Sequence, residues 1–216
     1  MVLKKRLLTA LLGIPLVLGV VWYGNWPYLI AGGILIGLSV DEWSRMAILF
    51  RAEKTWILLL GLLGTVYITT ALIALILLRM HFDDGLWWTL ALLLGVWASD
   101  TCAFLAGKAI GGPKLCPDIS PNKTWAGVGG GIAGSALTVA CLAAFAPLPL
   151  GWVEGAVLGA FMTPVGQVGD LLISYAKRKS GLKDTGTILP GHGGLLDRID
   201  ALLLCTVFMT AWVLLN

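Results

Sequence analysis

Long apolar runs recur along the whole sequence, and they limit the folds that this chain can adopt. Each run is long enough to cross a hydrocarbon core of about 30 Å. Only 12% of the residues are Asp, Glu, Lys or Arg, against about 25% in soluble domains. The sequence therefore predicts an all-α polytopic transmembrane helical bundle of about seven spans. The spans are placed at 7–23, 28–49, 56–79, 87–106, 126–147, 152–176 and 199–215.

The predicted organisation is a single integral membrane domain over residues 1–216. Its N-terminal spans occupy 7–79, and the region 87–216, in which the candidate catalytic residues described below lie, follows them. This composition excludes a secreted disulfide scaffold, a disordered chain and a free nucleic-acid-binding domain, so no nucleic acid is expected as a partner. The four cysteines form no CxxC pair, which argues against a zinc or disulfide framework. The first run is too long for a typical signal peptide and lacks a small-residue cleavage site, so we expect it to be retained.

Basic residues gather on one side of the predicted spans. If the N-terminus is cytoplasmic and the spans alternate, Arg79 alone of the 15 Lys and Arg residues falls on the outer side. Lys and Arg are enriched in cytoplasmic loops. The pattern predicts that the N-terminus and the two long polar stretches, 107–125 and 177–198, lie in the cytoplasm. These two polar loops are expected to form the active site together.

The sixth span carries ionisable residues at helical spacing. Asp170, Ser174, Lys177 and Arg178 fall at i, i+4, i+7 and i+8, which puts them on one helix face. Charged groups inside a membrane are costly and mark candidate functional sites. The alternative is a neutralised stripe that packs against another helix, although the polar Gln167 beside the face is not needed for packing.

The second polar stretch ends in further acids. After Lys183-Asp184, the Gly-rich run 189–194 surrounds His192 and resembles an anion-binding loop, because glycine lets backbone N–H groups approach a ligand. Asp197 and Asp200 then share a helix face at i and i+3. Carboxylate oxygens suit Mg²⁺, which binds one or two carboxylates together with phosphate oxygens. The alternative for Asp197 is a charge that answers the dipole of a helix N-terminus.

The first polar stretch offers a weaker candidate. Asp100 is submerged near the end of the fourth span, and Lys123 and Thr124 directly precede a predicted helix. A basic group and a hydroxyl at a helix N-terminus can hold a phosphate. An equally good interpretation of Lys123 is an ordinary lysine at the membrane boundary, beside a Ser-Pro turn.

Other motifs are better explained by structure. Glycines in 127–135 fit close helix packing through small residues. No P-loop motif occurs, and the sequence has only two histidines, which excludes a His-rich metal site. Asp41, Glu42 and Arg45 lie at helical spacing in the second span, and we interpret them as a neutralised structural cluster.

Acids that hold a metal and bases that hold phosphate are the groups needed for phosphoryl or nucleotidyl transfer. The run from Ser174 to Asp200, with Lys177-Arg178, Lys183-Asp184, the Gly-rich loop and Asp197-Arg198, resembles the signature of the phosphatidate cytidylyltransferases (CDP-diacylglycerol synthases). Gly169-Asp170-Leu171, the segment 120–125 and Ser99-Asp100 are similar to further family features. The family usually has Glu at position 126, where this chain has Ala, and its typical bacterial members are longer.

The resemblance implies transfer of a cytidylyl group from CTP to phosphatidate with Mg²⁺, and with a second cation as an option. It implies metal ligation by Asp170 and Asp197, with Asp200 and Asp184 as ligands or supporting groups and Asp100 in support. The implied catalytic residues are Asp170, Asp197, Lys177 and Arg178, and the two bases are implied to contact the nucleotide phosphates. The implied substrate-binding residues are Ser174, Lys123, Thr124, Lys183, His192, Gly193, Gly194 and Arg198. It also implies membrane lipids as partners, an option of a homodimer, and a location in a bacterial plasma membrane.

Three alternatives stay open at this point. The first is a cytidylyltransferase or kinase for another lipid phosphate, such as an isoprenoid. The second is a divalent-cation transporter, and the third is a catalytically inactive relative of the family.

Overall fold

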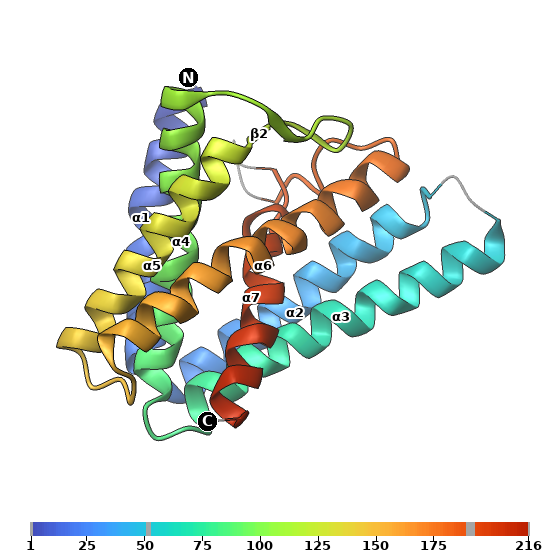
Figure 1. Cartoon of the computed structure of the whole chain (residues 1–216). Coiled ribbons are helices and arrows are strands. Elements are labelled where there is room, and N and C mark those ends of the chain that lie inside the picture. Colours follow the sequence, from blue (N-terminus) through green and yellow to red (C-terminus); the bar gives the residue numbers. More distant parts are fainter. Residues whose placement is uncertain (1, 51–52, 189–192, 216) are drawn as a thin grey trace.

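The structure is a computed structural model that describes residues 2–50, 53–188 and 193–215. Within these ranges the chain folds into seven helices and one small hairpin (Figure 1). The elements are α1 (Val2–Tyr23), α2 (Asn25–Ala47), α3 (Lys54–Met80), α4 (Gly85–Ile110), β1 (Lys114–Cys116), β2 (Ser120–Thr124), α5 (Trp125–Phe145), α6 (Trp152–Lys179) and α7 (Leu196–Leu215). The predicted helical membrane bundle is confirmed.

Five of the described helices, α3 to α7, are long and apolar enough to cross a membrane. The chain is therefore an integral membrane protein. Helix α1 contributes a shorter apolar part, Leu11–Tyr23. Helix α2 does not meet the same measure, because Asp41 and Glu42 lower the hydropathy of its C-terminal half. The count of seven spans remains a prediction.

The antiparallel hairpin β1–β2 was not predicted. It lies inside the polar stretch 107–125, where Lys114 pairs with Thr124 and Cys116 with Ser120. Strands of three and five residues are too short to show the period-two alternation that predicts a strand. The hairpin leads directly into α5 and fixes the direction in which that helix starts.

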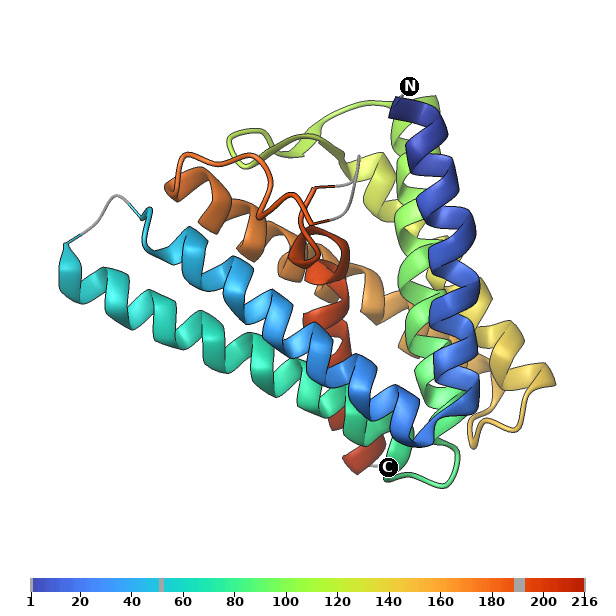
Figure 2. The same ribbon diagram turned by 180° about the vertical axis from the view of Figure 1, so that it is seen from behind.

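Helices α4, α5 and α6 pack in sequence order, and α7 packs against both α6 and α3. Figure 1 and the opposite view in Figure 2 show α1 beside α4 on one side, the α2–α3 pair on the other, and α7 between the two groups. Because the helices run up and down alternately, the end of α4, the hairpin, the end of α6 and the start of α7 face the same end of the molecule. The two polar stretches therefore meet.

Small residues allow the close packing of α4, α5 and α6. Gly127, Gly131 and Ser135 of α5 are buried, as the small-residue spacing predicts. A Cβ on Gly127 would lie 2.9 Å from the carbonyl oxygen of Ala103 in α4. A Cβ on Gly159 of α6 would lie 2.5 Å from the carbonyl oxygen of Ser135, so neither position tolerates a side chain without movement. These contacts hold the helices that carry Asp100 and Asp170.

Arg79, the exception to the predicted charge distribution, has a structural role. Its Nε donates a hydrogen bond to the carbonyl oxygen of Val21 at 2.7 Å, and Nη2 donates to that of Trp22 at 3.3 Å. These carbonyls belong to the last turn of α1, where a cation is favoured by the helix dipole. Arg79 thus joins the end of α3 to the end of α1.

Candidate active site

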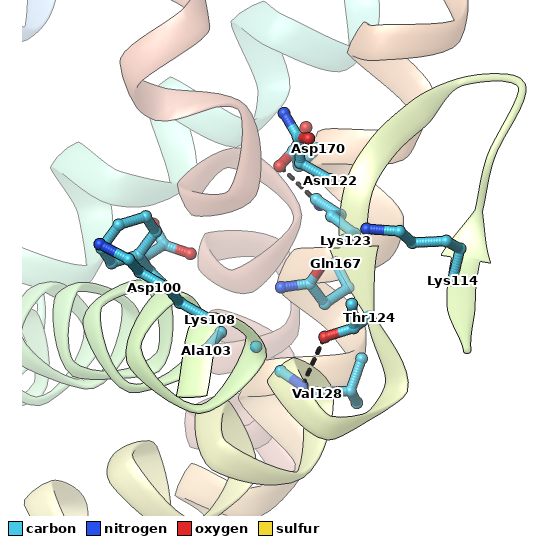
Figure 3. A pocket seen from close by; sticks show the side chains of 13 residues that line it. Asp100, Ala103, Lys108, Lys114, Asn122, Lys123, Thr124, Val128, Gln167 and Asp170 are labelled. Atoms are coloured by element: carbon cyan, nitrogen blue, oxygen red, sulfur yellow. Dashed lines mark hydrogen bonds and ion pairs between the residues drawn. The ribbon is translucent and has the colours of Figure 1, made fainter. Parts of the chain in front are cut away.

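A pocket of about 510 Å³ opens between the C-terminal half of α4, the hairpin, the first turns of α5, and α6 (Figure 3). Two acids, Asp100 and Asp170, line it from different helices, and Gln167 lies one turn before Asp170. The remaining lining residues are Ala103, Phe104, Gly107, Lys108, Lys114, Asn122, Lys123, Thr124, Gly127 and Val128. The pocket therefore brings together Asp100, Lys123, Thr124 and Asp170, which the sequence singles out from two separate regions.

Lysines give this pocket its basic character. Lys108 lies in the last turn of α4, Lys114 begins the hairpin, and Lys123 is the residue before its last. The sequence analysis includes Lys123 among the site residues but not Lys108 or Lys114, because a lysine at a membrane boundary is ordinary. Three lysines around one pocket suit a ligand with several phosphate groups.

An ion pair crosses the pocket from the hairpin to α6. Lys123 Nζ lies 2.6 Å from Asp170 Oδ2, and both side chains are mostly buried (Figure 3). On the other side of the carboxylate, Ser174 Oγ donates a hydrogen bond to Asp170 Oδ1 at 2.9 Å. The Ser174–Asp170 contact agrees with the predicted shared face of α6. Thr124 is buried, and its Oγ1 accepts a hydrogen bond from the backbone N–H of Gly127, so it caps α5.

A second ion pair joins α6 to the start of α7. Lys177 Nζ lies 2.6 Å from Asp197 Oδ1, and the two side chains are 10% and 4% exposed. Asp197 Oδ2 accepts hydrogen bonds from the backbone N–H groups of Thr185 at 2.8 Å and Gly194 at 3.1 Å. The two ends of the Ser174–Asp200 run therefore meet, although 20 positions separate Lys177 from Asp197.

Glu42 contacts the same segment, and its interpretation as part of a neutralised cluster is wrong. Arg45 pairs with Asp41 on the exposed face of α2. Glu42 is 2% exposed and accepts hydrogen bonds from Thr185 Oγ1 at 2.8 Å and from the backbone N–H groups of Leu195 and Leu196, each at 2.9 Å. One sequence signal could have identified it: the cluster holds two acids but only one base.

Arg178 connects the two polar stretches. Its Nε donates to the carbonyl oxygen of Ile119 in the hairpin turn at 3.3 Å, and Nη1 donates to that of Leu182 at 3.1 Å. The side chain is exposed, and its guanidinium group donates both of these hydrogen bonds to backbone oxygens. Its predicted contact with nucleotide phosphates remains a prediction.

The remaining predicted residues lie around the loop before α7. Lys183, Asp184 and Arg198 are exposed. Gly193 has a φ of +85°, and a Cβ there would lie 3.3 Å from Cβ of Asp184, so this glycine allows the loop to pass close to Asp184. His192 lies outside the described residues, and its predicted role stays a prediction.

The oxygen donors around the pocket fit Mg²⁺. Gln167 Oε1 is buried and has no hydrogen-bond partner among the described residues, and Asp100 and Asp170 line the same pocket. One or two carboxylates together with phosphate oxygens are the usual protein environment of Mg²⁺. Asp200 lies against the turn of α6 that precedes Asp170, since a Cβ on Gly169 would lie 2.8 Å from its backbone oxygen, and its Oδ1 accepts the backbone N–H of Ala201.

The four aspartates predicted as metal ligands do not form one cluster. Over residues 2–50, 53–188 and 193–215, no group of three or more His, Cys, Asp or Glu side chains is arranged to hold a metal. Asp197 is engaged by Lys177, and Asp184 is exposed on its loop. Metal ligation by Asp170 and Asp200, and by the other two aspartates, therefore remains a prediction.

Known proteins are similar in sequence to this chain over most of its length. Phosphatidate cytidylyltransferase of Brucella suis biovar 1 (strain 1330) is 38% identical over 187 residues, 82% of this chain and 68% of the relative. The protein of that name from Rickettsia conorii (strain ATCC VR-613 / Malish 7) is 34% identical over 215 residues, 94% of this chain and 88% of the relative. That from Bacillus subtilis (strain 168) is 37% identical over 147 residues, 68% and 55% of the two chains.

A family model described as "Cytidylyltransferase family" matches residues 49–215. The match contains every residue that lines the pocket and both partners of the Lys177–Asp197 ion pair. Since the matched region carries both polar stretches and the acids and bases that they bring together, this chain belongs to the cytidylyltransferase family.

Proposed function

We propose that this protein transfers a cytidylyl group from CTP to phosphatidate and releases pyrophosphate and CDP-diacylglycerol. The observation that carries the proposal is the pocket that Lys108, Lys114 and Lys123 line together with Asp100 and Asp170, at one end of a membrane-spanning bundle. We expect such a pocket to receive a nucleoside triphosphate from water and a lipid phosphate from the bilayer. The names of the relatives support this choice of substrates.

The reaction needs no nucleophile from the protein. A phosphate oxygen of phosphatidate attacks the α-phosphorus of CTP, a new P–O bond forms, and the bond from that phosphorus to the oxygen bridging to the β-phosphate breaks. The bond electrons leave with pyrophosphate. Catalysis then consists of positioning two anions and neutralising their charge. The lysines of the pocket reduce the repulsion between the two phosphorylated substrates.

Asp170, Asp100 and the oxygen of Gln167 are the groups that would hold Mg²⁺ in this pocket, with Asp200 nearby. Bound there, Mg²⁺ supplies positive charge to the phosphate oxygens. Lys123 keeps Asp170 compensated in the ligand-free protein through their 2.6 Å ion pair. In the complex, Mg²⁺ would be a second partner of opposite charge for Asp170, and a substrate phosphate would be one for Lys123.

The cellular setting is part of the same proposal. CTP is a soluble nucleotide, so the end of the bundle that carries the pocket faces the cytoplasm, in agreement with the distribution of Lys and Arg. We place the protein in a bacterial plasma membrane on the grounds of its relatives. Assembly as a homodimer stays a prediction from the family resemblance.

The test uses the full-length protein in detergent micelles with radiolabelled CTP. Phosphatidate and Mg²⁺ should give labelled CDP-diacylglycerol, and removal of Mg²⁺ with a chelator should abolish the product. Asp197→Asn should abolish turnover without loss of membrane insertion, whereas Asp118→Asn, at an exposed position in the hairpin turn, should be active. Turnover of an isoprenoid phosphate without turnover of phosphatidate would refute the choice of lipid.

A further inference from the structure

We infer that Glu42 is a positioning residue for cytidylyl transfer, which holds the segment 185–196 so that Asp197 stays against Lys177. The inference rests on the proposed function. Glu42 lies in α2, before the matched family region begins at residue 49, and it does not line the pocket. Its effect on the reaction must therefore pass through the residues that it contacts.

The contacts of Glu42 use both carboxylate oxygens. Oε1 accepts the N–H of Leu195, and Oε2 accepts the N–H of Leu196 and the hydroxyl of Thr185. The first N–H groups of a helix have no partner within the helix and favour a negative charge. None of the ion pairs in the described residues includes Glu42, so these three donors and the dipole of α7 stabilise the buried carboxylate.

Two residues contact both Glu42 and Asp197. Thr185 donates its hydroxyl to Glu42 and its backbone N–H to Asp197. Gly194 donates its N–H to Asp197, and a Cβ on Gly194 would lie 2.6 Å from Glu42 Oε2. We call Glu42, Thr185, Gly194 and Asp197 the carboxylate network. Because its two acids share these neighbours, a shift of Glu42 moves the groups that hold Asp197.

Close approach of Glu42 to the loop requires small residues there. A Cβ on Gly186 would lie 2.5 Å from Glu42 Oε1 and 2.9 Å from Cδ. Gly194 is buried and equally close, so a side chain at either position would push the carboxylate away. Glycine at positions 186 and 194 therefore lets the loop pass close to the Glu42 side chain.

Glu42 is itself held on a firm support. The next residue, Trp43, is buried and donates its Nε1–H to the carbonyl oxygen of Gly61 in α3 at 2.9 Å. Its ring fills the space above Gly64, where a Cβ would overlap it. One turn further along α2, the carbonyl oxygen of Met46 accepts a hydrogen bond from Ser180 Oγ at 3.0 Å. Helix α2 is thus fixed to α3 and to the end of α6.

The decisive experiment compares Glu42→Gln with Asp41→Asn, which removes the neighbouring but exposed carboxylate. Equilibrium binding of CTP with Mg²⁺ counts the sites per protein, and product formation gives the turnover per site. We expect Glu42→Gln to keep the number of CTP sites, because the pocket has no contact with Glu42. Its kcat per site should fall by about tenfold to a hundredfold, as expected for a misplaced catalytic group. Asp41→Asn should behave like the wild-type protein.

A second variant keeps the test decisive if Glu42→Gln does not fold. Thr185→Val removes one hydrogen bond to Glu42 and keeps the backbone N–H to Asp197, so its kcat per site should fall by a smaller factor, again without loss of CTP sites. A wild-type protein that forms no CDP-lipid would refute the proposed function. If the wild type is active and both variants have its kcat per site, the positioning role is overturned. The same holds if the variants lose CTP sites and total rate by the same factor, because the rate per site is then unchanged.

Discussion

Replacement of Lys177 by Met tests the ion pair between α6 and α7. The change removes the ammonium 2.6 Å from Asp197 Oδ1 but keeps an unbranched side chain that can fill the same space. Asp197 is 4% exposed, so water cannot readily replace the lost partner. The variant therefore leaves a buried carboxylate with the two backbone donors of Thr185 and Gly194.

The size of the effect follows from burial. Removal of one partner from a buried ion pair destabilises a protein by about 3–5 kcal/mol. We expect the lower end, about 3 kcal/mol, because two hydrogen bonds to the carboxylate remain. For a chain of this length, that corresponds to a decrease of about 6–12 °C in Tm. Turnover should fall as well, since the same side chain is a predicted contact of the nucleotide phosphates.

The assay is thermal unfolding in detergent of four proteins: the wild type, Lys177→Met, Asp197→Asn and the double variant. Because the two side chains contact each other, the double variant should be less destabilised than the sum of the singles by about 0.5–3 kcal/mol. Lys179→Met is the matched control. Lys179 is exposed, with Nζ 5.4 Å from the ring centre of Tyr175, so its loss should change stability by less than about 0.5 kcal/mol.

Two outcomes would refute this reasoning. Additive effects of Lys177→Met and Asp197→Asn would mean that the two side chains do not interact in the folded protein. An equal Tm for Lys177→Met and Lys179→Met would mean that the pair is exposed to water rather than buried.

Two further changes test packing and the link between the polar stretches. Gly159→Ala should lower stability by about 1–3 kcal/mol, because its Cβ meets the carbonyl oxygen of Ser135, whereas Gly129→Ala, with open space around it, should not lower the Tm. Arg178→Gln loses its contact with Ile119, so limited proteolysis should cut the hairpin faster than in the wild type, and equal rates would contradict the contact.

Local spacing predicted the parts of the site that lie on one helix. Asp170 and Ser174 are four residues apart and were predicted to share a helix face. In the structure, Ser174 Oγ donates a 2.9 Å hydrogen bond to Asp170 Oδ1. The sixth span was placed at 152–176, and α6 covers Trp152–Lys179. The seventh span was placed at 199–215, whereas α7 begins at Leu196. It begins earlier because Glu42 accepts hydrogen bonds from the backbone N–H groups of Leu195 and Leu196, and hydropathy does not register such a cap.

Contacts between distant residues could not be predicted in the same way. Lys123 reaches Asp170 only because α4, α5 and α6 pack closely enough to bring the hairpin over α6. Glu42 lies 154 positions before Leu196, and nothing in the spacing of α2 indicates that its carboxylate faces a helix start. The interpretation as a neutralised cluster followed from helical spacing within α2. In the folded protein, Glu42 instead accepts hydrogen bonds from Thr185, Leu195 and Leu196.

The carboxylate network separates two acids that look alike in sequence. Glu42 receives its hydrogen bonds from two backbone N–H groups and a buried hydroxyl, so all its partners are fixed by the fold. Asp197 uses Oδ2 in the same way, but its Oδ1 is held by Lys177, whose ammonium is carried on a flexible stem. A change in one lysine rotamer frees Oδ1, whereas freeing Glu42 requires α7 to lose its cap. Of the two acids, Asp197 is therefore the one with an oxygen that can change partners, and the role proposed for Glu42 is to keep Asp197 in place.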